Sequence, residues 1–217
     1  MAEMIIVGDI HGEIRSLEAL IREVGSSSGE FVFLGDYINR GPHSREVVDF
    51  LIDFGRKHSS VFLSGNHEWA FLRYLEIGEF DRFALLGGLS TLASYLPRVQ
   101  SGNIRKALIE RLPDRHLQFY KQLKIFFEND RAICSHAGVP NACPDDRSFQ
   151  ELVLGAHPEL FSEPTVTRKL NVCGHYLQES RTPFRFGKFV CLDTGCGTLP
   201  NGKLTALLLP EMRFVQV

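Results

Sequence analysis

Side chains that can bind metal ions follow the short apolar runs of this 217-residue chain. Aspartate, histidine and asparagine recur directly after these runs, and glycines flank most of them. In chain order they are Asp9, His11, Asp36, Asn66, His67, His136 and His175. In an open α/β sheet the carboxyl ends of the strands line the ligand crevice. We therefore expect these side chains to gather along one edge of a sheet.

This set of side chains is typical of a site for divalent metal ions. Hard cations prefer carboxylate and amide oxygens, while imidazole suits manganese, iron, zinc and cobalt. One four-coordinate ion cannot use so many ligands, whereas two ions that share a bridging carboxylate would use them all. Two metal ions about 3.5–4 Å apart clamp the attacking and leaving oxygens of a phosphoryl displacement. The residue types therefore predict a binuclear centre suited to displacement at phosphorus.

The segments that must position these side chains alternate between strand-like and helix-like patterns. Apolar residues recur at helical spacing in 13–24 and 44–58, and the residues after Glu68, 103–112 and 115–123 also have a helical pattern. Apolar runs with the length of buried strands are MIIVGD, FVFLGD, VFLSGN, AICSHAG, LNVCGH and FVCLDTG. This alternation predicts an α/β fold with a largely central sheet.

The chain length suits one domain, which we expect to span residues 1–217. Residues 203–217 have the pattern of one or two closing strands. Residues 140–168 are the least regular part, with scattered proline and aspartate, and are expected to form a surface excursion near the site.

Composition excludes several classes of protein. The net charge of −2 argues against a main role in binding nucleic-acid polymers or anionic membranes, because such proteins are usually more basic. The first residues lack the basic region of a signal peptide, and no segment approaches the ~20 apolar residues of a membrane-spanning helix. The five cysteines include no Cys-x-x-Cys pair, which favours a reducing, cytoplasmic location.

The motifs and their order resemble those of the calcineurin-like metallophosphoesterases, in particular the phosphoprotein phosphatase branch. The matching segments are GDIHG (8–12), GDYINRG (35–41), GNHE (65–68), HAG (136–138) and GH (174–175). Residues 192–209 are similar to the end of compact bacterial and phage serine/threonine phosphatases and of symmetrical diadenosine tetraphosphatases. Residues 87–95 also resemble a segment of the bacterial phosphatases. The resemblance implies a central β-sandwich flanked by helices.

The resemblance also implies a role for each motif residue. Asp36 would bridge two divalent ions, with manganese expected first and iron or zinc as alternatives. A water or hydroxide between the ions would attack phosphorus in line. The other ligands would be Asp9 and His11 on the first ion, and Asn66, His136 and His175 on the second.

Two further residues would act on the substrate. Arg40 would bind phosphate oxygens, which suits its delocalised head with several donors. His67 would be the general acid that protonates the leaving oxygen.

Asn39 departs from the phosphatase pattern, in which this position is usually Asp and pairs with the histidine that corresponds to His67. An Asp would favour the imidazolium and orient the ring, whereas Asn can accept a hydrogen bond from the ring but brings no charge. His67 should then be less readily protonated, which matters most for alkyl phosphates and least for phosphoanhydrides. The tetraphosphatases often lack that Asp too and share the Arg-Gly-Pro that follows it, whereas Glu68 and the compact length favour the phosphatases.

A phosphate-clamping arginine of the bacterial phosphatases is also missing, because the matching segment, 149–161, contains none. Arg147, Arg168, Arg181 and His157 are alternatives that remain open. Losing one charged clamp should weaken phosphate binding.

Four other residues near the motifs have less specific patterns. We interpret Cys134, Cys173 and Cys191, each two residues before His136, His175 and Asp193, as small buried hydrophobes rather than as a redox-sensitive layer around the site. Trp69 is interpreted as a core residue of its helix rather than a residue that flanks the site.

Three functions follow, in order of preference. The first is hydrolysis of phosphate monoesters, with phosphoserine or phosphothreonine proteins as candidate substrates. The alternative is hydrolysis of symmetrical dinucleoside tetraphosphates, which are phosphoanhydrides. The third is a regulatory relative without turnover, against which the complete set of metal ligands argues.

Overall fold

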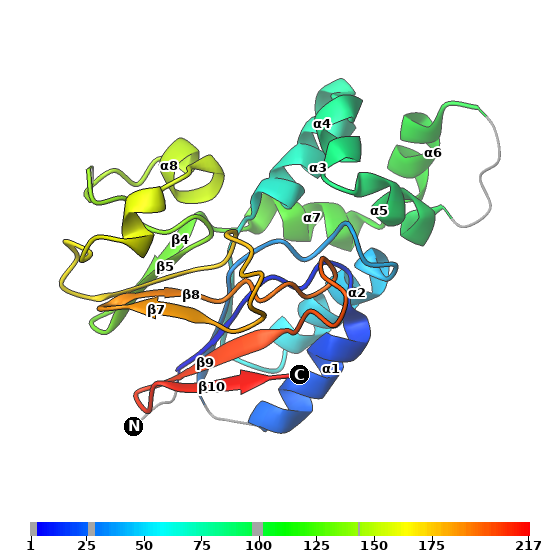
Figure 1. The fold of residues 1–217 in the computed structure, drawn as a ribbon. Coiled ribbons are helices and arrows are strands. Elements are labelled where there is room, and N and C mark those ends of the chain that lie inside the picture. The colour runs from blue at the N-terminus through cyan, green and yellow to red at the C-terminus, as the bar shows by residue number, and fades with distance from the viewer. Residues whose placement is uncertain (1–3, 26–28, 97–101, 143) are drawn as a thin grey trace.

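The computed structural model describes residues 4–25, 29–96, 102–142 and 144–217. Their strands form two five-stranded sheets (Figure 1). The first sheet has the order β10 (Arg213–Gln216), β9 (Thr205–Leu209), β1 (Met4–Val7), β2 (Glu30–Phe33) and β3 (Ser60–Phe62). The second has the order β4 (Phe126–Glu128), β5 (Ala132–Ser135), β6 (Leu170–Cys173), β8 (Phe189–Cys191) and β7 (Phe184–Phe186).

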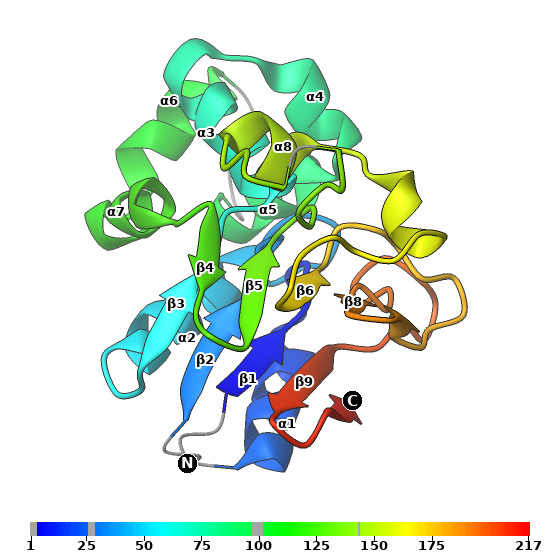
Figure 2. The ribbon, with the colours of Figure 1, turned by 90° about the vertical axis from the view of Figure 1, so that its left-hand side faces the viewer.

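Each sheet has three parallel strands, β1, β2 and β3 in the first and β5, β6 and β8 in the second. The remaining strands pair antiparallel. In Figure 2, β1, β2 and β5 all run toward the part of the molecule that holds α3 to α7. The loops that carry the motif residues therefore leave the two sheets on the same side.

Strand alternation gives each face of the first sheet its own core. Ile5 and Phe31 point to the face that packs against helices. Ile6 and Val32 point to the opposite face and pack with Val172 and other residues of the second sheet. This inter-sheet core confirms the expected β-sandwich, and burying each of these side chains contributes about 1.5–3 kcal/mol.

Helices are found at all of the segments with helical patterns. They are α1 (Ile14–Val24), α2 (Ser44–Gly55), α3 (Asn66–Ile77), α4 (Phe80–Leu85), α5 (Gly88–Tyr95), α6 (Ile104–Arg111), α7 (Asp114–Gln122), α8 (Phe149–Leu154) and the 3-10 turn η1 (Pro158–Phe161). Helices α4, α5 and α8 were not expected from the sequence, and neither were strands β4 and β7. Both strands lie at a sheet edge, neither contains a buried residue, and each includes an exposed charged residue, Glu128 or Arg185, so neither has the apolar run of a buried strand.

Residues 140–168 are more ordered than their sequence indicates. Leu152 of α8 packs with Ile133 and Val139, and Leu160 of η1 packs with Phe189. The expectation of a surface excursion is therefore only partly correct, because these leucines cover the outer face of the second sheet. The closing strands are confirmed as β9 and β10, which pair with each other and add to β1.

The cysteine and tryptophan interpretations are both confirmed. Cys134 lies in the core between the sheets, and Cys173 and Cys191 lie in the cluster on the outer face of the second sheet. Trp69 packs against the helical core, and the Arg82 guanidinium carbon lies 4.8 Å from its ring centroid.

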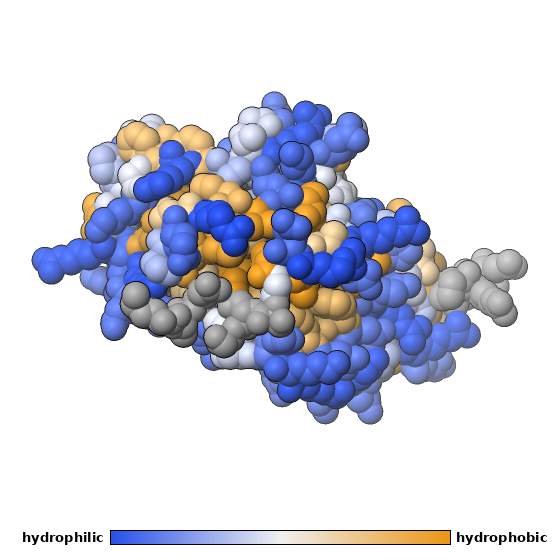
Figure 3. Space-filling view, turned by 90° about the horizontal axis from the view of Figure 1, so that it is seen from below, coloured by the Kyte–Doolittle hydropathy of each residue, from blue (hydrophilic) through white to orange (hydrophobic). Residues whose placement is uncertain are grey.

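None of the helices within the described residues is long and apolar enough to cross a bilayer. Figure 3 shows the face at the bottom of Figure 1, where apolar side chains gather near the centre and hydrophilic residues surround them. Some apolar exposure of this kind is normal, because polar atoms alone cannot cover a folded protein.

Candidate active site

The loops after β1 and β2 are joined by backbone hydrogen bonds. The amides of Ile10 and His11 both donate to the Asp36 carbonyl, at 3.0 and 2.9 Å, and Gly12 donates to the Tyr37 carbonyl at 2.8 Å. These bonds hold the first motif against the second although 27 residues separate His11 from Ile38.

Several residues of these loops have a backbone conformation that side chains rarely adopt. Their φ angles are positive: 46° at His11, 54° at Asp36, 70° at Asn39, 63° at Arg40 and 65° at His175. Each such residue costs of the order of 1–3 kcal/mol unless its surroundings compensate, and such strain concentrates at functional sites. The concentration of strain in the motif loops therefore supports a functional role for them.

Two glycines allow the carboxylates to lie close to the backbone. A Cβ atom at Gly65 would overlap Oδ1 of Asp36, and one at Gly174 would overlap Oδ1 of Asp9. The glycines of the third and fifth motifs are thus required by the close approach of the two aspartates.

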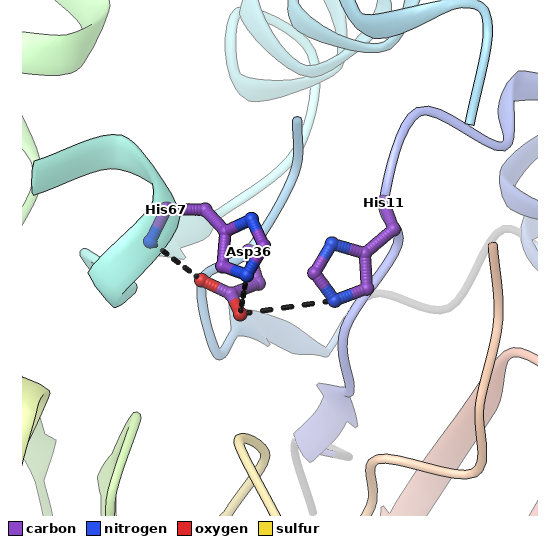
Figure 4. A group of neighbouring side chains, drawn as sticks. All are labelled: His11, Asp36 and His67. Atoms are coloured by element: carbon purple, nitrogen blue, oxygen red, sulfur yellow. Dashed lines mark hydrogen bonds and ion pairs between the residues drawn. The ribbon is translucent and has the colours of Figure 1, made fainter. Parts of the chain in front are cut away.

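Asp36 lies at the centre of the site. Its Oδ2 is 3.8 Å from Nε2 of His11 and 3.6 Å from Nε2 of His67 (Figure 4). Its Oδ1 is 3.4 Å from Nε2 of His136 and accepts the backbone N–H of His67 at 3.1 Å. Asp36 belongs to two groups whose ligand atoms lie within 4.8 Å of one another, one with His11 and His67 and one with Asp9 and His136. A carboxylate shared by two groups has the placement of a bridging ligand.

Asn66 and His175 complete the cluster. Oδ1 of Asn66 lies 3.0 Å from Nε2 of His136 and 3.1 Å from Nδ1 of His175. The backbone N–H of His175 donates to Oδ2 of Asp9 at 3.0 Å. The structure thus brings all six residues expected to be metal ligands into one cluster.

The orientation of two rings suits metal ions. Nδ1 of His11 lies 3.1 Å from the Ile38 carbonyl, and Nδ1 of His136 lies 2.9 Å from the Leu34 carbonyl. A carbonyl can only accept, so Nδ1 carries a proton in each ring, and Nε2 is the atom that faces the cluster and could bind a metal ion. Nε2 of His11 is buried without a hydrogen-bond partner among the described residues. A buried polar atom without a partner is costly, and a divalent ion at this place would satisfy it.

The charges of the cluster also favour a cation. Burial tends to lower the pKa of His136, but Asp36 and then Asp9 outweigh it and raise the pKa to about 10. Burial tends to raise the pKa of Asp36, but His136 and His67 outweigh it and hold the pKa well below its ordinary value. The carboxylates of Asp36 and Asp9 therefore stabilise the positive charge of a protonated His136. A metal ion can take the place of this positive charge. The residues fit divalent ions.

Glu68 has a structural role that the sequence reasoning missed. Its Oε2 accepts the backbone N–H of Asp36 at 2.8 Å and of Gly65 at 3.0 Å, and its Oε1 accepts that of Tyr37 at 2.8 Å. Burial and the charge of Asp36 raise its pKa to about 7. An acidic residue in the first turn of a predicted helix is a capping signal, which could have indicated this role.

Asn39 is fully buried and is oriented differently from our expectation. The hydroxyl of Thr91 donates to Oδ1 of Asn39 at 2.7 Å, and the amide Nδ2 lies 3.0 Å from Nδ1 of His67. The carboxamide therefore donates to the ring instead of accepting from it, because its nitrogen faces Nδ1 while its oxygen faces Thr91. Nε2 of the same ring faces the cluster, 3.6 Å from Oδ2 of Asp36 and 3.4 Å from Nη2 of Arg40.

Two influences hold His67 neutral. Burial is the larger one, and together with Arg40 it lowers the pKa of His67 to about 4 against the opposing effect of Asp36. We expected from Asn39 that His67 would be less readily protonated, and the lowered pKa agrees with this. The group at Nδ1 is an uncharged amide, which does not stabilise an imidazolium as a carboxylate would.

Arg40 is exposed at the rim of the cluster. Its Nη1 donates to Oγ1 of Thr198, and its Nη2 lies 3.4 Å from Nε2 of His67. Its backbone N–H donates to the Gly87 carbonyl at 3.3 Å. The contact with Thr198 was not anticipated, because 158 residues separate the two.

The four alternatives for the missing arginine lie in different places. Arg147 and Arg168 line a pocket with Glu128 that contains none of the expected metal ligands. Nε2 of His157 lies 2.9 Å from the Glu151 carbonyl. Nε of Arg181 donates to the Pro200 carbonyl at 3.1 Å, so Arg181 alone of the four contacts the loop that Arg40 also contacts.

Curated relatives match nearly the whole chain. It is 26% identical to the asymmetrical bis(5'-nucleosyl)-tetraphosphatase PrpE of Oceanobacillus iheyensis and 28% identical to that of Halalkalibacterium halodurans. Both alignments cover 98% of this chain, and 90% and 92% of the relatives. The serine/threonine-protein phosphatase BSL2 of Arabidopsis thaliana is 32% identical, over 48% of this chain and 12% of that protein.

Solved structures and a family model agree with this likeness. A protein proposed to be a diadenosine tetraphosphatase has a TM-score of 0.68 at 23% identity, over 100% of this chain and 93% of that one. The cold-active protein-tyrosine phosphatase of a Shewanella species has a TM-score of 0.64 at 18% identity, over 100% and 77%. These identities show a shared fold only. The model of the calcineurin-like phosphoesterases, however, matches residues 3–192, and the chain belongs to this family of phosphoric ester hydrolases.

Proposed function

We propose that this protein is a two-metal phosphohydrolase that cleaves the phosphoanhydride chain of dinucleoside polyphosphates. The observation that carries the proposal is the uncharged Asn39, whose amide donates to Nδ1 of His67. A ring held in this way cannot readily become an imidazolium, so it is a poor general acid. A leaving phosphate chain is weakly basic and needs little protonation, whereas an alkoxide needs a proton.

The metal ions would be held by the residues that the sequence indicated. Asp9, His11 and Asp36 would hold one ion, and Asp36, Asn66, His136 and His175 the other, with manganese, iron or zinc as candidates. When bound, two such ions supply Lewis-acid charge to the phosphoryl oxygens and lower the pKa of water.

The remaining roles belong to residues around the cluster. Arg40 binds phosphoryl oxygens, and the neutral His67 donates a hydrogen bond from Nε2 without giving up its proton. Glu68 keeps the backbone of 36–38 in place, which fixes the orientation of the Asp36 carboxylate. Asn39 and Thr91 set the tautomer of His67.

The tetraphosphatase relatives support this substrate class and refine it. They match 98% of the chain and are named asymmetrical, whereas the sequence motifs led us to consider a symmetrical enzyme. Asymmetrical cleavage of diadenosine tetraphosphate yields ATP and AMP, and symmetrical cleavage yields two ADP.

Hydrolysis of phosphate monoesters, including phosphoproteins, is the second candidate. One specific observation favours it: Glu68 completes the Gly-Asn-His-Glu motif, as in protein phosphatases. The buried Asn39 weighs against it, for the reason given above.

A comparison of substrates tests the proposal. Protein stripped with a chelator and reloaded with Mn²⁺ is given diadenosine tetraphosphate, a phosphoserine peptide and p-nitrophenyl phosphate, and the products are separated by anion exchange. We expect the dinucleotide to be cleaved fastest, and Asp36→Asn to abolish turnover of all three. Equal hydrolysis by stripped and reloaded protein would refute the two-metal mechanism, and preference for the peptide would select the second candidate.

We also propose that residues 1–217 act as one domain in a reducing, cytoplasmic setting, with a phosphorylated small molecule or protein as the partner rather than a nucleic-acid polymer or a membrane. The cysteines Cys134, Cys173, Cys191 and Cys196 are free, which supports the reducing compartment.

A further inference from the structure

We infer that a hollow beside Arg40 is a nucleoside subsite, which holds the ribose attached to the phosphate under attack. The inference rests on the proposed function and specifies which phosphorus is attacked. The hollow has a volume of ≈ 410 Å³ and lies between the start of α1, at Glu13 and Ser16, and residues 196–202. Pockets that hold small ligands have volumes of roughly 300–1,000 Å³, so a nucleoside portion fits.

The loop that lines the hollow contacts the candidate active site at two places. Gly197 packs so closely on the first motif that a Cβ atom there would lie 2.5 Å from the His11 carbonyl oxygen. Thr198, the next residue, accepts a hydrogen bond from Nη1 of Arg40. Thr198 is thus both part of the lining of the hollow and a contact of Arg40, and this one residue would separate a group in the hollow from a phosphate bound at Arg40.

The lining selects the chemical class of the occupant. Among the described residues, the lining contains no arginine, lysine or histidine side chain, and its charged group is the carboxylate of Glu13. A carboxylate repels a phosphate but accepts hydrogen bonds from sugar hydroxyls, as acidic residues do in dinucleotide-binding folds. Ser16 and Asn201 add neutral polar groups, and Leu199 and Pro200 offer apolar contact. A ribose with part of its base matches this lining, whereas another phosphate does not.

The loop 195–202 is held in shape before any ligand arrives. The backbone N–H groups of Thr198 and Leu199 donate to the Gly195 carbonyl at 3.0 and 2.8 Å, and Gly202 donates to the Leu199 carbonyl at 2.9 Å. Asn201 has a φ of 58°, in the left-handed region that asparagine tolerates better than most residues. A preformed loop loses little freedom when it binds a ligand.

Occupation of the subsite determines the bond that breaks. With the ribose beside Arg40, the phosphate at Arg40 is the α-phosphate. The oxygen of water forms a bond to this phosphorus, and the bond from the phosphorus to the oxygen that bridges it to the β-phosphate breaks. That oxygen leaves with ATP, AMP keeps the oxygen of water, and two protons pass to solvent at neutral pH.

Isotope labelling tests the position of attack. Diadenosine tetraphosphate is hydrolysed by the Mn²⁺-loaded protein in H₂¹⁸O, and the products are analysed by mass spectrometry. The inference requires the label in AMP. Label in ATP, or two ADP as products, would overturn it.

Two variants test the hollow itself. Ser16→Phe fills it, and Asn201→Gly removes a polar side chain while allowing the positive φ. We expect each to lower the ratio of kcat/KM for diadenosine tetraphosphate to that for p-nitrophenyl phosphate by about tenfold, whereas Glu18→Phe, on an exposed part of α1, keeps the wild-type ratio. A wild-type ratio in both folded variants would refute the subsite.

A binding measurement separates this inference from the proposed function. AMP is titrated into metal-stripped wild-type protein and Ser16→Phe, and binding is followed by calorimetry. We expect binding to the wild type that is at least tenfold weaker in the variant. Equal binding, or none to the wild type, would overturn the subsite. Failure of the proposed function would instead appear as no metal-dependent hydrolysis of either substrate by the wild type.

Discussion

The amide nitrogen of Asn39 lies 3.0 Å from Nδ1 of His67, with the amide oxygen occupied by the Thr91 hydroxyl. A carboxylate in the same place would accept a hydrogen bond from that ring nitrogen, but the amide donates a hydrogen bond to it. The two arrangements differ in where the ring proton lies and in how easily a second proton is held.

Asn39→Asp should convert His67 into a better general acid. We expect kcat on alkyl phosphates to rise by about tenfold relative to diadenosine tetraphosphate, because general acids contribute typically about 10²–10⁴-fold where the leaving group needs a proton. Steady-state rates on both substrates measure this ratio. The control is Gln118→Glu, which makes the same charge change on an exposed part of α7. If the ratio of kcat on alkyl phosphates to kcat on diadenosine tetraphosphate changed equally in both variants, Asn39 would not determine the preference for leaving groups.

Glu68→Gln should weaken metal binding through the loop that carries Asp36. The two carboxylate oxygens of Glu68 accept hydrogen bonds from the backbone N–H groups of Asp36 and Tyr37. In glutamine one of these oxygens is replaced by an NH₂ group, which cannot accept. Loss of such support typically lowers metal affinity by about 10–100-fold. Titration of stripped protein with Mn²⁺ measures the change. Glu76→Gln, at an exposed position of the same helix, should bind Mn²⁺ like the wild type, and unchanged affinity in Glu68→Gln would contradict the role given to Glu68.

Thr91→Val should destabilise the fold, because it removes the donor to Oδ1 of Asn39. It also removes one of the two acceptors of the Asn39 backbone N–H, at 2.9 Å, and leaves the Ser44 hydroxyl at 3.1 Å. Buried polar groups left without partners cost about 1–3 kcal/mol each. Urea unfolding should show a lower free energy of unfolding by about that amount. Thr182→Val, at an exposed site, should stay within about 0.5 kcal/mol of the wild type, and an equal effect of the two changes would rule out the network.

His116 should make stability depend on pH. Its Nε2 lies 2.7 Å from Asp49 and its Nδ1 2.7 Å from the Tyr95 hydroxyl. Burial lowers its pKa and outweighs the opposing effect of Asp49. A lowered pKa means that folding favours the neutral ring, so its contribution is complete above the unfolded pKa of about 6.5 and is lost as the pH falls below it.

The measurement is urea unfolding at pH 7.5 and 5.0. Between these values we expect the free energy of unfolding to fall more for the wild type than for His116→Gln, which cannot titrate. An equal fall in both proteins would assign the pH dependence to other groups.

Much of the site could be predicted because its signals are local. Asp9, Asp36 and His136 each follow an apolar run that ends in a tight turn, and strand ends of this kind face one edge of a sheet. The order of the segments then indicated the family and the sandwich. The edge strands β4 and β7 gave no such signal, since neither contains a buried residue and partly exposed strands do not need a continuous apolar run.

The direction of each hydrogen bond depended instead on groups that are distant in the chain. Asn39 meets Thr91 across 52 residues, and Glu68 meets the N–H of Tyr37 across 31. An amide or an imidazole can present either a donor or an acceptor, and the neighbours that the fold supplies select one. Residue types and their spacing therefore indicated which side chains form the site. The fold decided which groups face the two ring nitrogens of His67 and which loop Arg40 contacts, because both depend on contacts that no local pattern contains.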